Sequence, residues 1–391
     1  MFELLETPPI DALHSVAQRY KADTRPQKMD LGVGVYRDEN GLSKVLASIR
    51  TAEKAHIEQQ ISKSYVGLRG ELDFIDAIEG LIWNGNSSSN VASVQAIGGT
   101  GAITQALQLV KKTNPHATVI VGLPTWPNHI SIANQLGLRT KTYGYFCREE
   151  QILKLNTLRE TIKGAQAGDI LILHGPCHNP SGEDMPSKDF LDILNLTQQH
   201  GVIPLIDTAY YGLGNCLDED MALLRQAFDA CDQLMVAMSC SKAFSMYRER
   251  VGILFVKTST AKSAALAQAN LEFLGRTSYS MPPSHGAVAV SRVLGNETLR
   301  ELWQSELKTM RERIVTVRSR LSKSADKFPC LGAISKQKGI FSLLPFSPSC
   351  IEKLASDHGI YLPTSGRINI AGFKTGDIEY FLNSLEKTSN R

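Results

Sequence analysis

A lysine that follows a short apolar stretch is the residue best suited to covalent chemistry. Lys242 comes after the apolar run 234–238, behind small hydroxyl residues, and Arg250 follows it. Such a run predicts a buried strand, and the carboxyl ends of strands are where α/β sheets present functional side chains. An amine held there, partly removed from water, has a lowered pKa and can attack a carbonyl group. A surface lysine after a core strand is the alternative, so Lys242 needs support from other segments.

Hydroxyl and guanidinium groups beside Lys242 could bind an anion at the same place. Ser239, Ser241 and Arg250 surround the lysine in the sequence. Pyridoxal phosphate is the cofactor that needs both features, because its aldehyde reacts with a lysine and its phosphate needs such groups.

A glycine-rich segment, residues 98–101, opens a helical pattern. Backbone N–H groups at a helix N-terminus offer a second site for a phosphate, although a plain turn is equally compatible. The segment does not match GxGxxG, because a start at Gly99 puts Thr104 at the third glycine position. No GxxxxGK[ST] motif occurs, so an NTPase is not supported.

A carboxylate and a phenol stand at the end of another apolar run, 202–207. Asp207 could cap the next helix. Alternatively, a buried carboxylate could face a pyridine nitrogen and keep it protonated, so that the ring works as an electron sink. Tyr210 could then reach the phenolic oxygen of the ring.

The segment 174–182 contains two histidines in HxxxH spacing. A proline separates His174 from His178 and no third ligand is near, so we expect no metal site. Asn179 is the better candidate, as a neutral donor to a ring oxygen.

Three further residues could bind a planar, carboxylated ligand. Trp126, at the end of a predicted strand, is either a packing plug or a stacking surface. Arg276 and Arg367 could each grip a carboxylate with two parallel hydrogen bonds, or lie on the surface.

Composition and charge exclude several classes of protein. The 391 residues suffice for two domains, and the scattered net charge of +3 disfavours nucleic-acid binding. No apolar run reaches the ~18 residues of a membrane span, and the N-terminus lacks a signal-peptide pattern. The seven cysteines form no CxxC pair, as is typical of reduced thiols. We therefore expect a cytoplasmic protein without membrane or nucleic-acid partners.

Strand-like and helix-like segments alternate between about residues 95 and 258, which predicts a mainly parallel sheet with helices on both faces. Predicted strands are 117–121, 169–174, 202–207, 234–238 and 252–256, and predicted helices are 101–112, 128–136, 188–200 and 219–230. A long amphipathic helix over 297–325 is suited to linking two lobes. We expect a large domain over 45–300 and a small α+β domain over 301–391, with residues 1–44 packing against the small domain.

Together these segments resemble the fold-type I class I aminotransferases, most closely the subgroup of aspartate and aromatic-amino-acid aminotransferases. The resemblance covers essentially the whole chain. The motifs that carry it are Leu31-Gly-Val-Gly34-Val-Tyr36, Tyr65-Val-Gly67, Gly98-Gly-Thr-Gly101, Thr125-Trp126-Pro-Asn-His129, His178-Asn179-Pro180, Asp207-Thr-Ala-Tyr210, Ser239-Cys-Ser-Lys242, Glu249-Arg250-Val-Gly252, Tyr279-Ser-Met-Pro-Pro283 and Ser365-Gly-Arg367. The family fold is an α/β domain with a seven-stranded, mainly parallel sheet plus a small α+β domain.

The resemblance also implies a role for each candidate residue in a pyridoxal-phosphate enzyme. Lys242 would bind the cofactor aldehyde and shuttle the proton. Asp207 would pair with the ring nitrogen, with His129 behind it. The remaining cofactor contacts would come from Tyr210 and Asn179 at the ring oxygen, from Trp126 on the ring face, and from Gly99, Thr100, Ser239, Ser241 and Arg250 at the phosphate, with Tyr65 of a neighbouring subunit. Substrate contacts would come from Gly34, Trp126, Asn179 and Arg367, with Arg276 of the neighbour, so the resemblance implies a homodimer.

The implied reaction is a ping-pong transamination between an L-amino acid and 2-oxoglutarate. Arg276 favours a dicarboxylate such as aspartate, whereas Met281, where aspartate enzymes typically have asparagine, suggests that tyrosine, phenylalanine or tryptophan also fits. The alternatives are a lyase or decarboxylase on the same fold and a non-catalytic regulatory protein. A regulatory protein would need a DNA-binding segment, and residues 1–44 contain no basic recognition helix.

Overall fold

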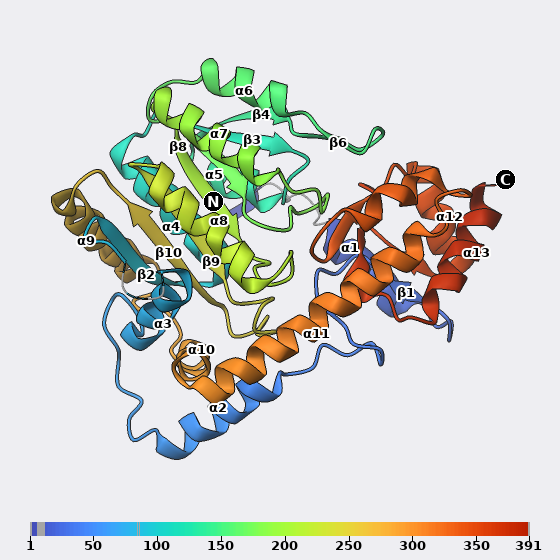
Figure 1. Cartoon of the computed structure of the whole chain (residues 1–391), viewed down its shortest axis with the longest axis horizontal. Coiled ribbons are helices and arrows are strands. Elements are labelled where there is room, and N and C mark those ends of the chain that lie inside the picture. Colours follow the sequence, from blue (N-terminus) through green and yellow to red (C-terminus); the bar gives the residue numbers. More distant parts are fainter. Residues whose placement is uncertain (1, 6–11, 84, 86, 390–391) are drawn as a thin grey trace. The chain divides into compact units, whose positions relative to one another are not determined.

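The computed structural model describes residues 2–5, 12–83, 85 and 87–389 (Figure 1). Its internal contacts divide the chain into two compact units. The small unit comprises Met1–Ser43, Ile314–Lys336 and Ile340–Arg391, and the large unit comprises Lys44–Arg313 and Gln337–Gly339.

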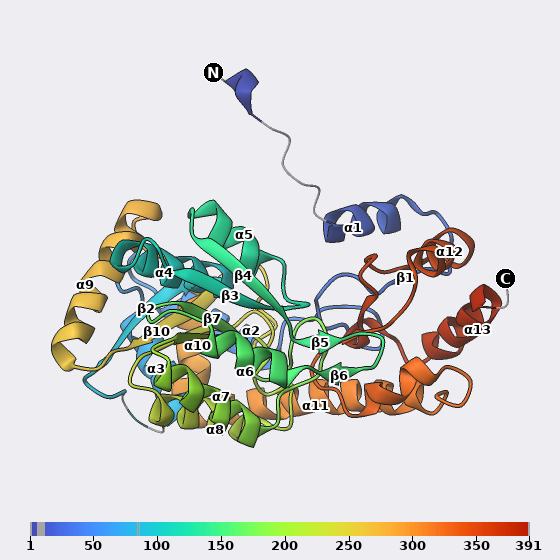
Figure 2. The same cartoon turned by 90° about the horizontal axis from the view of Figure 1, so that it is seen from above.

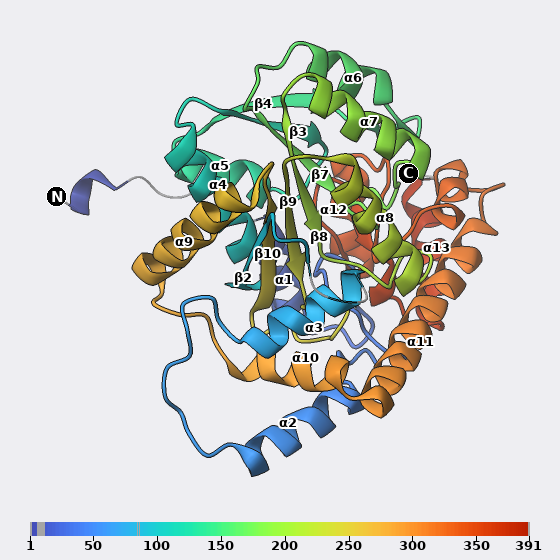
Figure 3. The same ribbon diagram turned by 60° about the vertical axis from the view of Figure 1, so that its left-hand side comes forward.

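A seven-stranded sheet forms the centre of the large unit (Figure 3). Its strands, in spatial order, are β2 (Val91–Ile97), β10 (Val251–Lys257), β9 (Leu234–Ser239), β8 (Ile203–Thr208), β7 (Ile170–His174), β3 (Thr118–Leu123) and β4 (Arg139–Gly144). β10 pairs antiparallel with β2 and with β9, and the other neighbouring strands of this sheet pair in parallel. The predicted fold class is confirmed, and β9 is buried at every position, as expected for a strand covered on both faces.

Helices cover both faces of this sheet. α4 (Gly98–Thr113), α5 (Asn128–Gln135) and α9 (Ala261–Ser278) lie on one face, and α6 (Leu155–Lys163), α7 (Ser187–Gln199) and α8 (Leu217–Ala230) lie on the other (Figure 3). The unit also contains α2 (Ala47–Gln59), α3 (Leu72–Trp83), α10 (His285–Gly295) and a short ribbon of β5 (Phe146–Cys147) and β6 (Ile152–Leu153).

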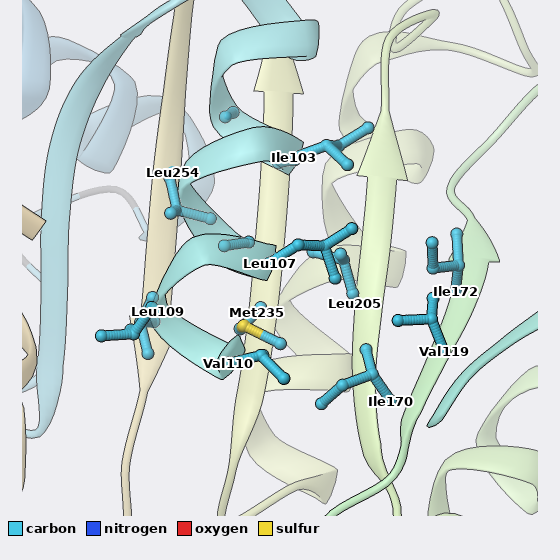
Figure 4. Packing of buried hydrophobic residues seen from close by; sticks show 14 of the residues in the cluster. Ile103, Leu107, Leu109, Val110, Val119, Ile170, Ile172, Leu205, Met235 and Leu254 are labelled. Carbon is cyan, nitrogen blue, oxygen red and sulfur yellow. The ribbon is translucent and has the colours of Figure 1, made fainter. Parts of the chain in front are cut away.

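The core between α4 and the sheet explains why the glycine-rich segment continues as a helix. Ile103, Leu107 and Val110 recur at helical spacing and are buried against strand residues such as Met235 and Leu254 (Figure 4). Burying a side chain of this size contributes roughly 1.5–3 kcal/mol, so this stripe fixes the helix and its N-terminus on the sheet.

The predicted long helix is present as α11 (Glu297–Ser322), which ends three residues earlier than expected. The boundary between the two units falls within it, at residue 313/314. In the large unit, Trp303 stacks on Phe244 with ring centroids 4.5 Å apart and donates a hydrogen bond to the carbonyl of Ala243. Along the same helix, residues 314, 317 and 321 are buried in the small unit.

The small unit joins the two ends of the chain. β1 (Met29–Asp30) pairs in parallel with β12 (Ile360–Tyr361), and β11 (Phe341–Leu343) pairs antiparallel with β13 (Arg367–Asn369). Its other helices are α1 (Ala12–Ala22), α12 (Pro348–His358) and α13 (Asp377–Ser389) (Figure 2). Three short 3₁₀ helices, η1 (Phe2–Leu4), η2 (Pro329–Ser335) and η3 (Ile370–Gly372), complete its described elements. Among the described residues of both units, no helix is long and apolar enough to span a membrane.

Candidate active site

A pocket in the large unit lies where β8 and β9 end, at the carboxyl edge of the sheet. This edge is where α/β proteins bind ligands. The pocket is lined by Gly99, Thr100, Trp126, Asn179, Asp207, Ala209, Tyr210, Ser239, Ser241, Lys242 and Arg250. Of these, only Ala209 was not predicted from the sequence. The Ala209 methyl group has no reactive or polar atom. Only its position between Asp207 and Tyr210 in the sequence could have indicated that it lines the pocket.

Lys242 lies in the turn that follows β9, as its position after an apolar run predicted. The side chain is half-buried, and its Nζ lies 5.2 Å from the centroid of the Tyr210 ring. The amine and the phenol therefore share one pocket, although they come from successive strand ends.

An arginine and a glycine backbone meet at the N-terminus of α4. Gly98 has φ +65, and a Cβ there would lie 2.6 Å from a terminal nitrogen of Arg250, so no larger residue fits without displacing the guanidinium. Arg250 also donates a 3.4 Å hydrogen bond to the Ser241 hydroxyl. Arg250 has φ +55, in the left-handed region that residues other than glycine rarely adopt. The guanidinium, the hydroxyl and the helix N-terminus together can hold an anion.

Asp207 is largely buried, with its side chain 10% exposed, and pairs with His129 from α5. His129 Nε2 lies 3.0 Å from Asp207 Oδ2. Burial raises the pKa of Asp207, but the hydrogen bond and the charge of His129, with smaller electrostatic effects of His174 and Lys242, outweigh it, so the pKa is lowered overall. The helix-cap alternative is wrong, because α8 begins at Leu217 and its N-cap is Cys216.

A threonine extends this pair into a chain of hydrogen bonds. Thr125 Oγ1 lies 2.8 Å from His129 Nδ1 and 3.1 Å from His174 Nε2. Burial, with a smaller effect of His129, lowers the pKa of His174 to about 3, so this ring is neutral at pH 7. We did not predict a role for Thr125 from the sequence.

The two histidines of the HxxxH pattern both lie in the large unit. Their ring centroids are 4.2 Å apart, and His178 Nδ1 lies 2.8 Å from the Ser181 hydroxyl. Within the described part of the chain, no group of three or more His, Cys, Asp or Glu residues is arranged to hold a metal ion.

The two predicted partner-subunit residues, Tyr65 and Arg276, are not among the pocket-lining residues. Tyr65 is 88% exposed, and Arg276 is exposed in the last turn of α9, where it donates a 3.0 Å hydrogen bond to Ser280. The segments that carry them are in contact, because the backbone N–H of Val66 lies 3.3 Å from the Met281 sulfur.

The two predicted carboxylate-binding residues, Gly34 and Arg367, belong to the small unit. Arg367 is buried, stacks on the Phe341 ring at 4.1 Å and donates a 2.9 Å hydrogen bond to the carbonyl of Gly32. Gly34 lies against the same ring, since a Cβ there would come within 2.8 Å of Phe341 Cζ.

Comparison with known proteins identifies the family. The family model of class I and II aminotransferases matches residues 26–385. The tyrosine aminotransferase of Rhizobium meliloti is 41% identical, covering 96% of this chain and 97% of the relative, and the aspartate aminotransferase of Haemophilus influenzae is 34% identical, covering 99% and 100%. The structure of an aromatic-amino-acid aminotransferase from Burkholderia pseudomallei, covalently bound to pyridoxal phosphate, matches with a TM-score of 0.95 and 31% identity, covering 99% of each chain. This chain therefore belongs to the class I and II aminotransferases and is an enzyme of their aspartate and aromatic-amino-acid subgroup.

Proposed function

We propose that this aminotransferase uses pyridoxal phosphate to move the amino group of aspartate or an aromatic amino acid to 2-oxoglutarate by a ping-pong mechanism. The observation that carries the proposal is the meeting of Lys242, Asp207 and Arg250 in one pocket. An amine for the aldehyde, a carboxylate for the ring nitrogen and a guanidinium for the phosphate are the three contacts that this cofactor needs.

The pocket residues fit the cofactor as a set. The absence of a side chain at Gly98 leaves the Arg250 guanidinium against the start of α4, which suits a phosphate. We assign the phosphate to Gly99, Thr100, Ser239, Ser241 and Arg250, the ring oxygen to Asn179 and Tyr210, and the ring face to Trp126. When bound, the cofactor supplies an electron sink for the carbanion formed at the substrate α-carbon.

The protein residues supply charge and proton transfer. Asp207 stays ionised because His129 donates to it, so it can keep a facing ring nitrogen protonated. Lys242 Nζ would act as the base that takes the proton from the substrate α-carbon and holds it until it is returned. The Tyr210 ring lies 5.2 Å from the Lys242 amine, close enough for the phenol to orient a ring oxygen beside that amine.

We assign the substrate α-carboxylate to Arg367 and Gly34. The guanidinium carbon of Arg367 lies 4.1 Å from the centroid of the Phe341 ring, and a guanidinium can bind a carboxylate through two parallel hydrogen bonds. The second carboxylate of a dicarboxylic substrate is assigned to Arg276, and a cofactor phosphate contact to Tyr65, both from the partner in a homodimer. The exposure of Tyr65 and of nearby apolar residues, such as Ile61 at 101%, supports such an interface.

The division into two units supports an assignment of the domains. We propose that the large unit is the cofactor-binding domain and the small unit the smaller domain of the fold, with residues 1–43 belonging to the latter.

Steady-state kinetics test the proposal most directly. Aspartate, glutamate, tyrosine and phenylalanine serve as donors, with 2-oxoglutarate or oxaloacetate as the acceptor. We expect parallel double-reciprocal lines and turnover with both a dicarboxylic and an aromatic donor. Release of carbon dioxide or ammonia without formation of a new amino acid would identify a decarboxylase or lyase instead.

A further inference from the structure

One buried amide in the small unit holds the loop that contains Gly34. Asn369, the last residue of β13, is fully buried, and its Nδ2 donates to the carbonyls of Val33 and Val35 at 2.7 Å each. Its backbone N–H donates to the carbonyl of Leu31 at 2.8 Å. The loop is therefore fixed on both sides of Gly34 by a single residue.

These bonds determine which way the Gly34 N–H points. The carbonyl of Val33 and the N–H of Gly34 belong to the same trans peptide, in which the two groups point in opposite directions. Because Asn369 draws the carbonyl toward itself, the N–H points away from Asn369. Val35 N–H also donates to the Val33 carbonyl at 3.0 Å, which closes a tight turn around Gly34.

Arg367 is tied to the same loop from the same strand. Residues two apart in a strand share a face, so Arg367 and Asn369 both project toward the loop from β13. Arg367 donates to the carbonyl of Gly32, and its guanidinium rests on the Phe341 ring that also packs on Gly34. The Arg367 guanidinium and the Gly34 N–H are therefore two hydrogen-bond donors that are positioned by the same strand, loop and aromatic ring.

We infer that Asn369 is a positioning residue of the α-carboxylate site, which orients the Gly34 N–H to donate to the carboxylate that Arg367 holds. The inference rests on the proposed function, in which Arg367 and Gly34 bind that carboxylate. Every amino acid and 2-oxo acid substrate has this group. A change at Asn369 should therefore affect all of them equally, whatever their side chain.

The test uses Asn369→Leu in the cofactor-loaded enzyme, because leucine keeps the volume but removes both donors. We expect the KM values for aspartate, phenylalanine and 2-oxoglutarate, and the Kd of the inhibitor 3-phenylpropionate by calorimetry, to rise together by about tenfold or more. The kcat and the visible absorbance of the bound cofactor should change little. An unchanged Kd, or a rise for only one side-chain class, would overturn the inference.

Two controls separate a positioning role from general destabilisation. Thr388→Val removes a buried hydrogen bond to Ser384 in the same unit, away from the loop, and should leave every KM unchanged. If it raises KM as Asn369→Leu does, the effect is not specific. Arg367→Lys tests the proposed function itself. If this variant has unchanged KM values, the assignment of the α-carboxylate to Arg367 is wrong. If Arg367→Lys has raised KM values but Asn369→Leu has normal kinetics, only the inference about Asn369 is wrong.

A measurement on the unmodified enzyme covers the case in which Asn369→Leu does not fold. Amide hydrogen exchange of Gly34 should slow when 3-phenylpropionate binds, because its N–H then donates to the carboxylate. Unchanged exchange at saturating inhibitor would contradict the inference.

Discussion

His129 Nε2 lies 3.0 Å from Asp207 Oδ2, and this contact joins the first turn of α5 to the end of β8. The His129 side chain is fully buried and that of Asp207 is 10% exposed, so the pair is largely shielded from solvent and its attraction is stronger than between exposed groups. The carboxylate is kept ionised in a place where burial alone would favour its neutral form. A charged acid held in this way is what a protonated pyridine ring requires.

Asp207→Asn should therefore retain the cofactor but lose much of its catalytic effect. The amide cannot stabilise a protonated ring nitrogen, so the single-turnover rate with aspartate should fall by roughly 10²–10³-fold, as for loss of one preorganised electrostatic group. The cofactor Kd should change much less, because the phosphate contacts remain. Stopped-flow absorbance and equilibrium dialysis measure the two quantities. A normal single-turnover rate would contradict the role of Asp207.

Lys242 should be the residue that borohydride links covalently to the cofactor. Peptide mapping after reduction identifies the labelled lysine, and label at another lysine would overturn the assignment. Lys242→Ala should still bind the cofactor through its phosphate but lose turnover by more than the roughly 10²–10⁴-fold that general acid–base groups contribute. Lys257→Ala is a suitable control, since that side chain bonds to the carbonyl of Phe228, does not line the pocket and should not affect labelling.

The sequence predicted the pocket well because its chemistry is local. Asp207, Lys242 and Asn179 each follow an apolar run, and β-strand ends of a parallel sheet gather at one edge, so proximity followed from strand order. The hydrogen-bond chain through Thr125 was not predicted, because it depends on the side-chain orientations of three separate segments. β2 and β4 were also missed: β4 is mostly exposed, so its sequence lacks an apolar run.

Contacts between distant segments were the least predictable part of the small unit. Asn369 and Val33 are 336 residues apart, and no local pattern signals that an amide at one position binds a carbonyl at the other. The role that we infer for Asn369 could be recognised only from the structure of the folded loop.

Arg276→Leu should separate the two substrate classes. Loss of a charge-assisted pair of roughly 1.5–3 kcal/mol should lower kcat/KM for aspartate and 2-oxoglutarate by about tenfold to a hundredfold. Phenylalanine and tyrosine should be spared or improved, because their side chains leave the guanidinium without a carboxylate partner, and a buried unpaired charge is unfavourable. Equal losses for both classes, measured with matched donors, would show that Arg276 does not select the side chain.

The buried histidines should make stability fall as the solution becomes acidic. Burial lowers the pKa of His174 to about 3 from an ordinary value of 6.5, and lowers the pKa of His178 well below it. Below about pH 6.5 these histidines bind protons in the unfolded chain but not in the folded chain, so the free energy of unfolding decreases as the pH falls. For His174 the loss between pH 7.5 and pH 5 is about 2 kcal/mol.

Asp220 should have the opposite effect on the pH dependence of stability, and a variant at this position is the matched control. Burial raises the pKa of Asp220 to about 6 from 3.8, so as the pH falls the carboxylate is protonated in the folded chain before it is protonated in the unfolded chain. This difference adds about 1.4 kcal/mol to the free energy of unfolding at pH 5 relative to neutral pH. Chemical denaturation at fixed protein and cofactor concentrations measures both effects. His174→Gln should flatten the loss of stability between pH 7.5 and 5, whereas Asp220→Asn should steepen it. A His174→Gln variant with the full pH dependence would show that this ring is not held neutral, because only its titration, and not its packing, changes that slope.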